Sequence, residues 1–147
     1  MAPDHVLVPL DGSPLSADAL EHALETFDCR TTVLNVVTPI DGGMSEGGIL
    51  ETDDDRHETA RERAQTLVGQ AREQAASVDR TVETAVETGD PAETIIEYVD
   101  DNAVDHVVMG SHGQDRHAVV RRLLGTVATR VVGESPVTVT VVREPQT

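Results

Sequence analysis

Short apolar runs alternate along the chain with longer stretches in which apolar residues recur every three or four positions. The apolar runs predict strands at residues 5–10, 31–37, 104–109 and 136–142, and a stretch of alternating apolar and polar residues predicts a half-exposed strand near a sheet edge at 78–87. The periodic stretches predict helices from Pro14 to Phe27, over 53–77, from Pro91 onward and over 119–132. Helices that alternate with strands are typical of βα units around a parallel sheet. A chain of 147 residues fits one domain, spanning residues 1–147.

Three of the predicted helices begin with recognisable signals. Ser13 and Asp90 are residue types that cap helices, and each precedes a proline, which suits the first helical position. The helix over 53–77 begins with three consecutive aspartates. Because acidic side chains stabilise a helix N-terminus, we interpret these aspartates as helix-start residues rather than as a metal site.

The charge balance is strongly acidic. The chain has 27 acidic and 11 basic residues, a net charge of −16, and none of its basic residues is a lysine. Such a surface argues against nucleic-acid and membrane-surface partners, and it is typical of proteins kept soluble in high salt, which predicts a salt-adapted organism. The single cysteine, Cys29, gives no disulfide framework, and no signal peptide or membrane span is evident. We therefore expect a cytoplasmic protein.

Two turns that follow predicted strands are candidate ligand sites, Pro-Leu-Asp-Gly-Ser at 9–13 and Met-Gly-Ser-His-Gly at 109–113. An open parallel sheet binds ligands at the carboxyl ends of its strands, where the strand order reverses. Gly110 and Gly113 would let a ligand approach the main chain closely, and the amides of a following helix start form an anion site. The second turn therefore predicts a cradle for phosphate.

An arginine-rich segment follows that turn. Residues 111–133 contain four arginines and a single acid, Asp115, in a chain that is otherwise acidic. Two interpretations stand side by side. The segment is a positive region that attracts a small polyanion, or its arginines are the exposed face of the amphipathic helix over 119–132.

Other motifs of nucleotide and catalytic chemistry are missing from the sequence. There is no G-x-G-x-x-G, no lysine for a Walker A loop and no G-x-S-x-G. Cys29 lacks the surroundings that would activate a thiol. His112 and His117 lack the partner residues of a usual metal site, so a loop role or a hydrogen bond to a ligand is the better interpretation. We predict no catalytic constellation.

Over essentially its whole length the chain resembles the universal stress protein family. VLVPLDGS at 6–13 resembles the family's first strand and turn, and GDPAETI at 89–95 resembles the loop before its third helix. VVMGSHG together with LLGTVATRVV resembles the nucleotide motif of its ATP-binding members, which runs Gly, two residues, Gly, nine residues, Gly, then Ser or Thr. Gly110, Gly113, Gly125 and Thr126 supply the fixed letters.

This resemblance implies a fold and a ligand. The fold is an open five-stranded parallel α/β sheet in the order 3-2-1-4-5 with helices on both faces, a Rossmann-like fold of the adenine nucleotide α-hydrolase-like type. ATP, alone or bound to Mg²⁺, would lie over the ends of the strands at 5–10 and 104–109. The contacting residues implied by the motif positions are Pro9, Leu10 and Asp11 for adenine and ribose, Val36 for the base, Met109, Gly110 and Gly113 for ribose and the α-phosphate, and Gly125, Thr126 and Val127 for the outer phosphates. We add His112 as a cofactor-binding residue through a hydrogen bond to the ligand.

One feature departs from the family pattern. Between Gly113 and Gly125 the chain has eleven residues, where the motif usually has nine. A surface insertion costs little in loop closure, so we expect the fold to accommodate it. The two extra residues either lengthen a short helix over the phosphates or move Gly125 and Thr126 away from the γ-phosphate.

The function implied is that of an ATP-binding stress-response module, a regulatory or protective dimer with at most slow ATP hydrolysis. The alternatives are a nucleotide-free dimeric scaffold of the same fold and a slow ATPase. The resemblance also implies a homodimer through the strand at 136–142, which the family's strand order places at a sheet edge. We expect the amide of Thr138 or Thr140 to donate across that interface.

The acidic surface generates a prediction about folding. Because the excess negative charges repel one another more strongly when screening is removed, the melting temperature should rise from low salt toward molar KCl. Thermal unfolding followed by circular dichroism across that range checks it. A melting temperature that stays constant would contradict the interpretation of the surface as salt-adapted.

Overall fold

The computed structural model describes residues 2–39, 53–112 and 124–144. Along the chain it contains β1 (His5–Pro9), α1 (Pro14–Thr26), β2 (Arg30–Val37), α2 (Asp53–Ala76), β3 (Glu83–Thr88), α3 (Pro91–Asp101), β4 (His106–Gly110), α4 (Thr126–Glu134) and β5 (Thr138–Val142). The five strands form one parallel sheet in the order β3-β2-β1-β4-β5, which confirms the predicted architecture.

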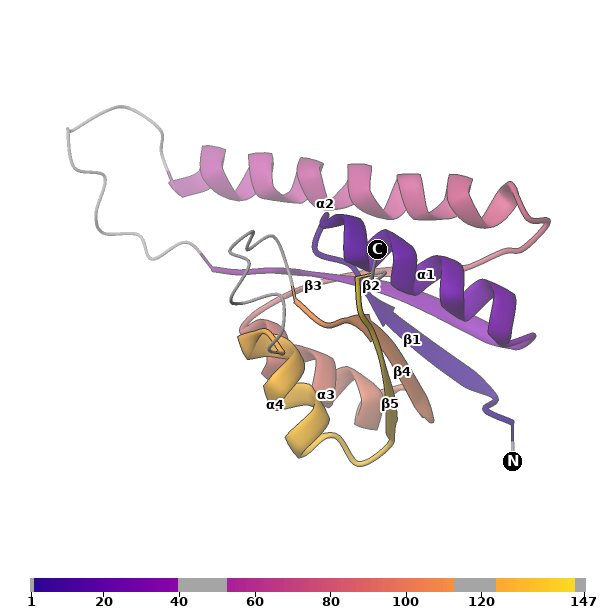
Figure 1. Ribbon diagram of the computed structural model, residues 1–147. Helices are drawn as coiled ribbons and strands as arrows, with labels where there is room; N and C mark the ends of the chain where they lie inside the picture. Colours follow the sequence, from indigo (N-terminus) through magenta and orange to yellow (C-terminus); the bar gives the residue numbers. More distant parts are fainter. Residues whose placement is uncertain (1, 40–52, 113–123, 145–147) are drawn as a thin grey trace.

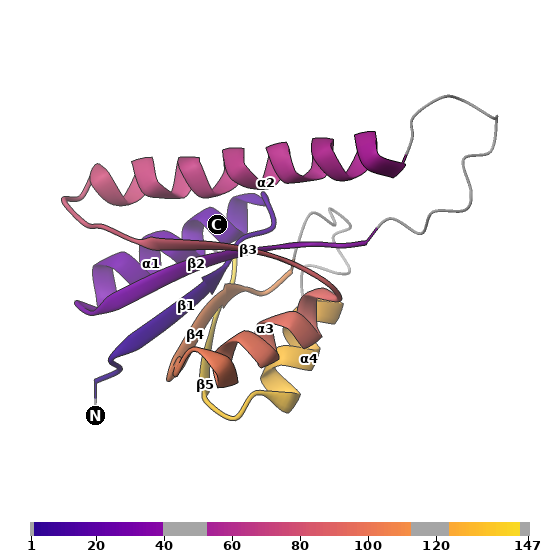
Figure 2. The same cartoon turned by 180° about the vertical axis from the view of Figure 1, so that it is seen from behind.

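The helices form a layer on each face of the sheet. Figure 1 shows α1 and α2 on one face and α3 and α4 on the other, and Figure 2 shows the same layers from behind. Side chains from one strand alternate between the two layers. In β1, Val6 and Val8 pack with α1 and α2, whereas Leu7 packs with α3 and α4. Burial on both faces explains why this strand is a continuous apolar run.

The predicted helix caps are confirmed. The Ser13 hydroxyl accepts a hydrogen bond from the amide of Ser16 (3.3 Å), and the Asp90 carboxylate accepts one from the amide of Glu93 (3.0 Å). Pro14 and Pro91 occupy the first positions of α1 and α3. These caps determine where the chain turns from β1 into α1 and from β3 into α3.

The prediction of a strand over 78–87 is wrong at its beginning. Residues 77–79 form a turn that ends α2, with Asp79 in the left-handed region at φ 58°. The amides of Asp79 and Arg80 donate to the carbonyls of Ala76 and Ala75 (3.0 and 2.9 Å), so the backbone there caps a helix. The strand itself lies at the sheet edge and is partly exposed, as predicted.

The prediction of a continuous helix over 119–132 is also wrong at residues 124–125. Leu124 and Gly125 are not helical, and α4 begins at Thr126. The amide of Gly125 donates to the carbonyl of Ser111 (2.7 Å), which holds the chain against the end of β4 before the helix starts. Residues 119–123 lie outside the described part of the chain.

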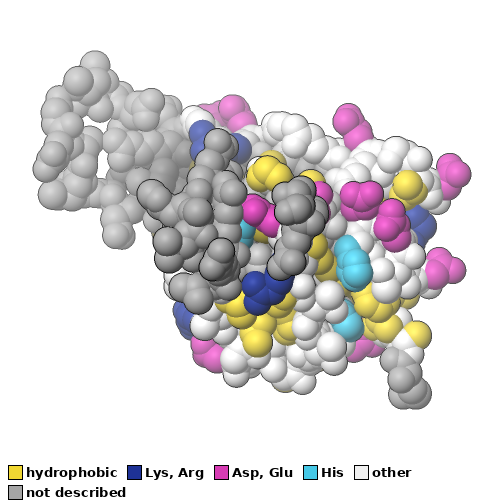
Figure 3. Space-filling view, viewed as in Figure 1, with side chains coloured by type: hydrophobic (Ala, Val, Ile, Leu, Met, Phe, Trp, Pro, Cys, Tyr) yellow, Lys and Arg dark blue, Asp and Glu magenta, His cyan; other side chains and the backbone are white. Residues whose placement is uncertain are grey.

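Acidic side chains are spread over the face seen in Figure 3, among few basic ones. Within the described residues, no helix is both long enough and apolar enough to span a membrane.

Candidate nucleotide site

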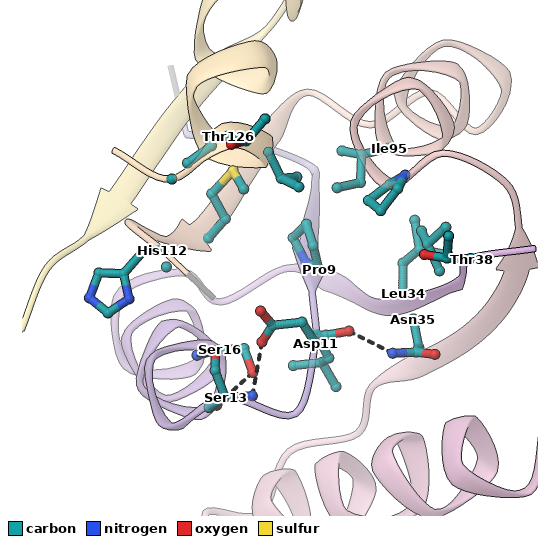
Figure 4. Close-up of a pocket in the computed structure, with 18 residues that line it drawn as sticks. Pro9, Asp11, Ser13, Ser16, Leu34, Asn35, Thr38, Ile95, His112 and Thr126 are labelled. Carbon is teal, nitrogen blue, oxygen red and sulfur yellow. Dashed lines mark hydrogen bonds between the residues drawn. The ribbon is translucent and has the colours of Figure 1, made fainter. Parts of the chain in front are cut away.

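A cavity of about 430 Å³ opens at the carboxyl ends of β1, β2 and β4 and is bordered by the first turns of α3 and α4 (Figure 4). The strand order reverses at β1, because β2 lies on one side of it and β4 on the other. The cavity therefore lies where open α/β sheets bind ligands, and its volume falls in the range of about 300–1,000 Å³ that is typical of small-molecule sites.

The structure brings together around this cavity the predicted site residues that it describes. These are Pro9, Leu10, Asp11, Val36, Met109, Gly110, His112, Gly125, Thr126 and Val127. The remaining predicted residue, Gly113, lies outside the described part of the chain, as do Arg116, Arg121, Arg122 and His117.

Further lining residues were missed by the sequence analysis. They are Ser13, Ser16, Leu34, Asn35, Thr38, Pro91, Ile95 and Ala128. Asn35 carried a usable signal, because it is a polar residue inside the apolar run at 33–37. Pro91 and Ile95 carried none, since only the fold places α3 beside the end of β2.

The turn after β1 is held by hydrogen bonds from both sides. The Asp11 carboxylate accepts a hydrogen bond from the amide of Ser13 (2.9 Å), and Gly12 adopts φ 85°, which a residue with a side chain rarely does. The amide of Leu10 donates to the carbonyl of Leu34 on β2 (2.8 Å). Asp11 is exposed at the rim of the cavity, where its carboxylate lies within reach of a ligand.

The β1–β2 ladder ends at this turn. The last paired residues are Pro9 and Leu34, and the next backbone bond would run from the amide of Val36 to the carbonyl of Leu10. That carbonyl instead accepts a hydrogen bond from the side-chain amide of Asn35 (2.7 Å; Figure 4). The backbone N–H and C=O of Val36 therefore face the side that β1 has left, beside the cavity.

Gly110 has a packing role that the sequence analysis did not foresee. A Cβ atom at this position would lie 2.9 Å from the Cβ of Leu15 in α1. The glycine therefore permits close contact between the end of β4 and α1, in addition to lining the cavity. Gly125 is similarly close to its neighbours, since a Cβ there would lie 3.1 Å from the Cα of His112.

The N-terminus of α4 presents backbone amides to the cavity. Gly125 is the N-cap and provides no side-chain hydrogen bond to the helix. Its own amide donates to Ser111, so it is already engaged. Thr126 and Val127 follow in the first turn, where amides have no acceptor within the helix, and both residues line the cavity. The positive end of the helix dipole adds to their suitability for an anion.

Charged groups border this region but are paired with one another. Arg130 of α4 contacts Asp90 (3.0 Å) and Glu134 (3.1 Å), and the hydrogen bond to Glu134 raises the pKa of its guanidinium. For Arg130 these ion pairs favour the interpretation that the arginine belongs to the exposed face of the helix, and not the interpretation that it binds a polyanion. His112 is buried, and its Nε2 lies 3.4 Å from a carboxylate oxygen of Glu144.

The described residues include no group of three or more His, Cys, Asp or Glu side chains arranged to hold a metal ion. Burial raises the pKa of the Cys29 thiol, which makes it a poor nucleophile at neutral pH. The described lining of the cavity combines backbone groups, apolar walls and polar side chains such as those of Asp11 and Thr126.

The fold and the position of the cavity define a Rossmann-like α/β protein. The chain belongs to the universal stress protein family, whose sequence profile matches residues 3–143. It is 30% identical over 146 residues to the universal stress protein MJ0531 of Methanocaldococcus jannaschii, an alignment that covers 96% of this chain and 82% of that protein.

Solved structures share the fold at lower identity. The hypothetical protein MJ0577 superposes with a TM-score of 0.81 at 24% identity, covering 98% of each chain. A universal stress protein in complex with cAMP gives 0.71 at 21% identity, covering 99% of this chain and 100% of that one. A family protein from Arabidopsis thaliana with AMP bound gives 0.70 at 17% identity, covering 97% and 93%.

The contact between Gly110 and Leu15 generates a prediction. Gly110→Ala should lower the free energy of unfolding by about 1–3 kcal/mol, because the added methyl group overpacks the junction of β4 and α1. Chemical denaturation measures the loss. In the double variant Gly110→Ala/Leu15→Gly the cost of the alanine should shrink, since glycine removes the Leu15 Cβ atom that the added methyl group would meet. Additive effects of the two substitutions would contradict the packing role.

Proposed function

We propose that this protein binds ATP or a related adenine nucleotide in the cavity and acts as a nucleotide-dependent module of the stress response, not as a dedicated enzyme. The observation that carries the proposal is the presence of unused backbone hydrogen-bonding groups at both ends of one cavity, at Val36 and at the start of α4. The AMP and cAMP complexes of proteins with this fold support the choice of an adenine nucleotide.

The base would lie against the end of β2. Adenine presents an amino donor beside a ring nitrogen acceptor, and the C=O and N–H of one extended residue form the complementary pair. Val36 offers such a pair where the ladder with β1 has ended. Apolar lining from Pro9, Ile95 and Met109 would cover the faces of the ring.

The ribose and phosphates would extend from there toward α4. The exposed carboxylate of Asp11 is an acceptor for ribose hydroxyls at the rim. The amides of Thr126 and Val127, with the helix dipole behind them, would bind phosphate oxygens. Mg²⁺, where it accompanies ATP, would be held mainly by the phosphates, and the carboxylate of Asp11 lies at the rim of the same cavity.

The proposed setting is the cytoplasm of a salt-adapted organism. A net charge of −16, the absence of lysine and a single cysteine support this setting.

The phosphate contact can be tested by removing one amide. Thr126→Pro deletes the N–H at the first position of α4, where proline is favoured, and Gly125 before it already has the extended conformation that proline requires (φ −64°, ψ 167°). We expect the affinity for ATP to fall by about tenfold or more, because a hydrogen bond to a charged group is lost. Isothermal titration calorimetry in molar KCl measures the change.

Thr126→Ala is the matched control, since it removes the side chain and keeps the amide, and it should bind ATP nearly as the wild type does. Equal binding by Thr126→Pro would place the phosphates elsewhere. A wild-type protein that binds none of ATP, ADP, AMP and cAMP would leave the nucleotide-free scaffold as the function.

We also propose that the protein is a homodimer joined antiparallel through residues 136–142. β5 is an edge strand, and its outward side carries unpaired backbone groups. The amide of Ser111 donates to the carbonyl of Val142 (2.8 Å), so the backbone N–H and C=O of Val142 point toward β4. The backbone groups of every second residue in a strand point to the same side, so those of Thr138 and Thr140 also point toward β4. The expectation that one of these amides donates across the dimer interface is therefore wrong. The backbone N–H and C=O groups of Val139 and Val141 point to the free edge of the sheet instead.

This orientation selects the variant that tests the dimer. Val141→Pro removes an outward-facing N–H and spares the ladder with β4, so it should yield monomers. Val141→Ala keeps the N–H and should remain dimeric. Light scattering at tens of micromolar protein in molar KCl distinguishes the two. A wild-type monomer under these conditions would refute the proposal.

A further inference from the structure

The hydrogen bond from Asn35 to Leu10 replaces a bond of the sheet. In the register of β1 and β2, the step after the Pro9–Leu34 pair would join the amide of Val36 to the carbonyl of Leu10. The structure forms the first half of that step, since the amide of Leu10 donates to Leu34 (2.8 Å). It does not form the second half, and the Leu10 carbonyl accepts from Nδ2 of Asn35 at 2.7 Å.

The side of the sheet on which Asn35 lies explains how the replacement works. Side chains alternate along β2, so Asn35 points to the same face as Val33, which packs with α1 and α2. A donor on that face draws the Leu10 carbonyl out of the plane of the sheet. The amide of Val36 lies in the plane of the sheet. A Leu10 carbonyl that points to the side chain of Asn35 therefore points away from the amide of Val36.

Burial makes this bond hard to lose. Asn35 is 8% exposed, and a buried amide without a partner costs free energy. Leu10 is 7% exposed, so its carbonyl also needs a donor within the protein. A valine or leucine at position 35 would continue the apolar run of the strand, and the carbonyl would then have the amide of Val36 as its nearest donor.

We infer that Asn35 is a positioning residue that occupies the Leu10 carbonyl and so keeps the amide of Val36 available for the base of the nucleotide. This inference rests on the proposed function for the identity of the ligand. It assigns to Asn35 a role in selecting adenine that involves no contact with the base, because Asn35 acts through the neighbouring backbone.

The competition for the carbonyl can be measured without any nucleotide. In Asn35→Leu, the amide of Val36 should bond to the Leu10 carbonyl, and its hydrogen exchange, followed by NMR, should slow by about tenfold or more. Thr32→Val is the matched control. It breaks a buried hydrogen bond at the other end of β2, where the Thr32 hydroxyl lies 2.8 Å from Nε2 of His5, and it should leave exchange at Val36 unchanged or faster.

Base selection provides the second measurement. Inosine monophosphate carries a ring N–H and a carbonyl where AMP carries a ring acceptor and an amino group, so the backbone of Val36 should favour AMP. We expect the ratio of AMP to inosine monophosphate affinity to fall by about tenfold in Asn35→Leu. The ratio should stay at the wild-type value in Thr32→Val. A general loss of stability would lower both affinities and leave the ratio unchanged.

The outcomes separate the inference from the function on which it rests. Exchange at Val36 that is unchanged or faster in Asn35→Leu would overturn the inference, whatever the protein binds. An unchanged affinity ratio with slower exchange would overturn the role in base selection. A wild-type protein that binds neither nucleotide, with slower exchange in the variant, would overturn the proposed function and leave the competition between Asn35 and Val36 established.

Discussion

The parallel pairing of β1 with β2 on one side and with β4 on the other is the constraint on which the rest of the structure depends. β1 is buried on both faces, and after it the chain turns into α1 on one face of the sheet, whereas α4, the next described helix after β4, lies on the other face. The cavity lies at the carboxyl ends of these strands, where the strand order reverses. The strand order determines the position of the cavity. The residues at which the β1–β2 pairing ends and α4 begins determine which backbone groups line it.

Backbone groups dominate that chemistry. The end of β2 and the start of α4 each leave amides that the regular structure does not use, and the side chains nearby mainly fix the backbone in place. Asn35 turns a carbonyl, Asp11 closes a turn, and Gly110 and Gly125 allow close packing. Backbone groups and apolar walls of this kind suit the recognition of a ligand.

Much of the fold could be predicted from the sequence because its signals are local. Apolar runs marked the central strands, and Ser13 and Asp90 marked helix starts within a few residues of their partners. The error at 77–79 came from a local turn that ends a helix, whereas Gly125 and Asn35 were misjudged because a distant contact decides the backbone there. The periodic apolar residues over 119–132 do not form one helix, because the amide of Gly125 donates to the carbonyl of Ser111. The side chain of Asn35 donates to the carbonyl of Leu10, 25 positions away. The list of site residues came from a family resemblance, whereas their individual roles needed the strand register.

The two edges of the sheet differ in a way that bears on assembly. β3 carries Glu83 and Glu87 on a partly exposed strand, and its sequence ETAVET has a charge near each end. β5, with the sequence TVTVV, has none. Charge discourages a second chain from pairing along an edge, so the sheet is open to growth in one direction only. In the proposed dimer the two β5 strands pair with each other, and the acidic edge at β3 disfavours the addition of further copies that would lead to filaments.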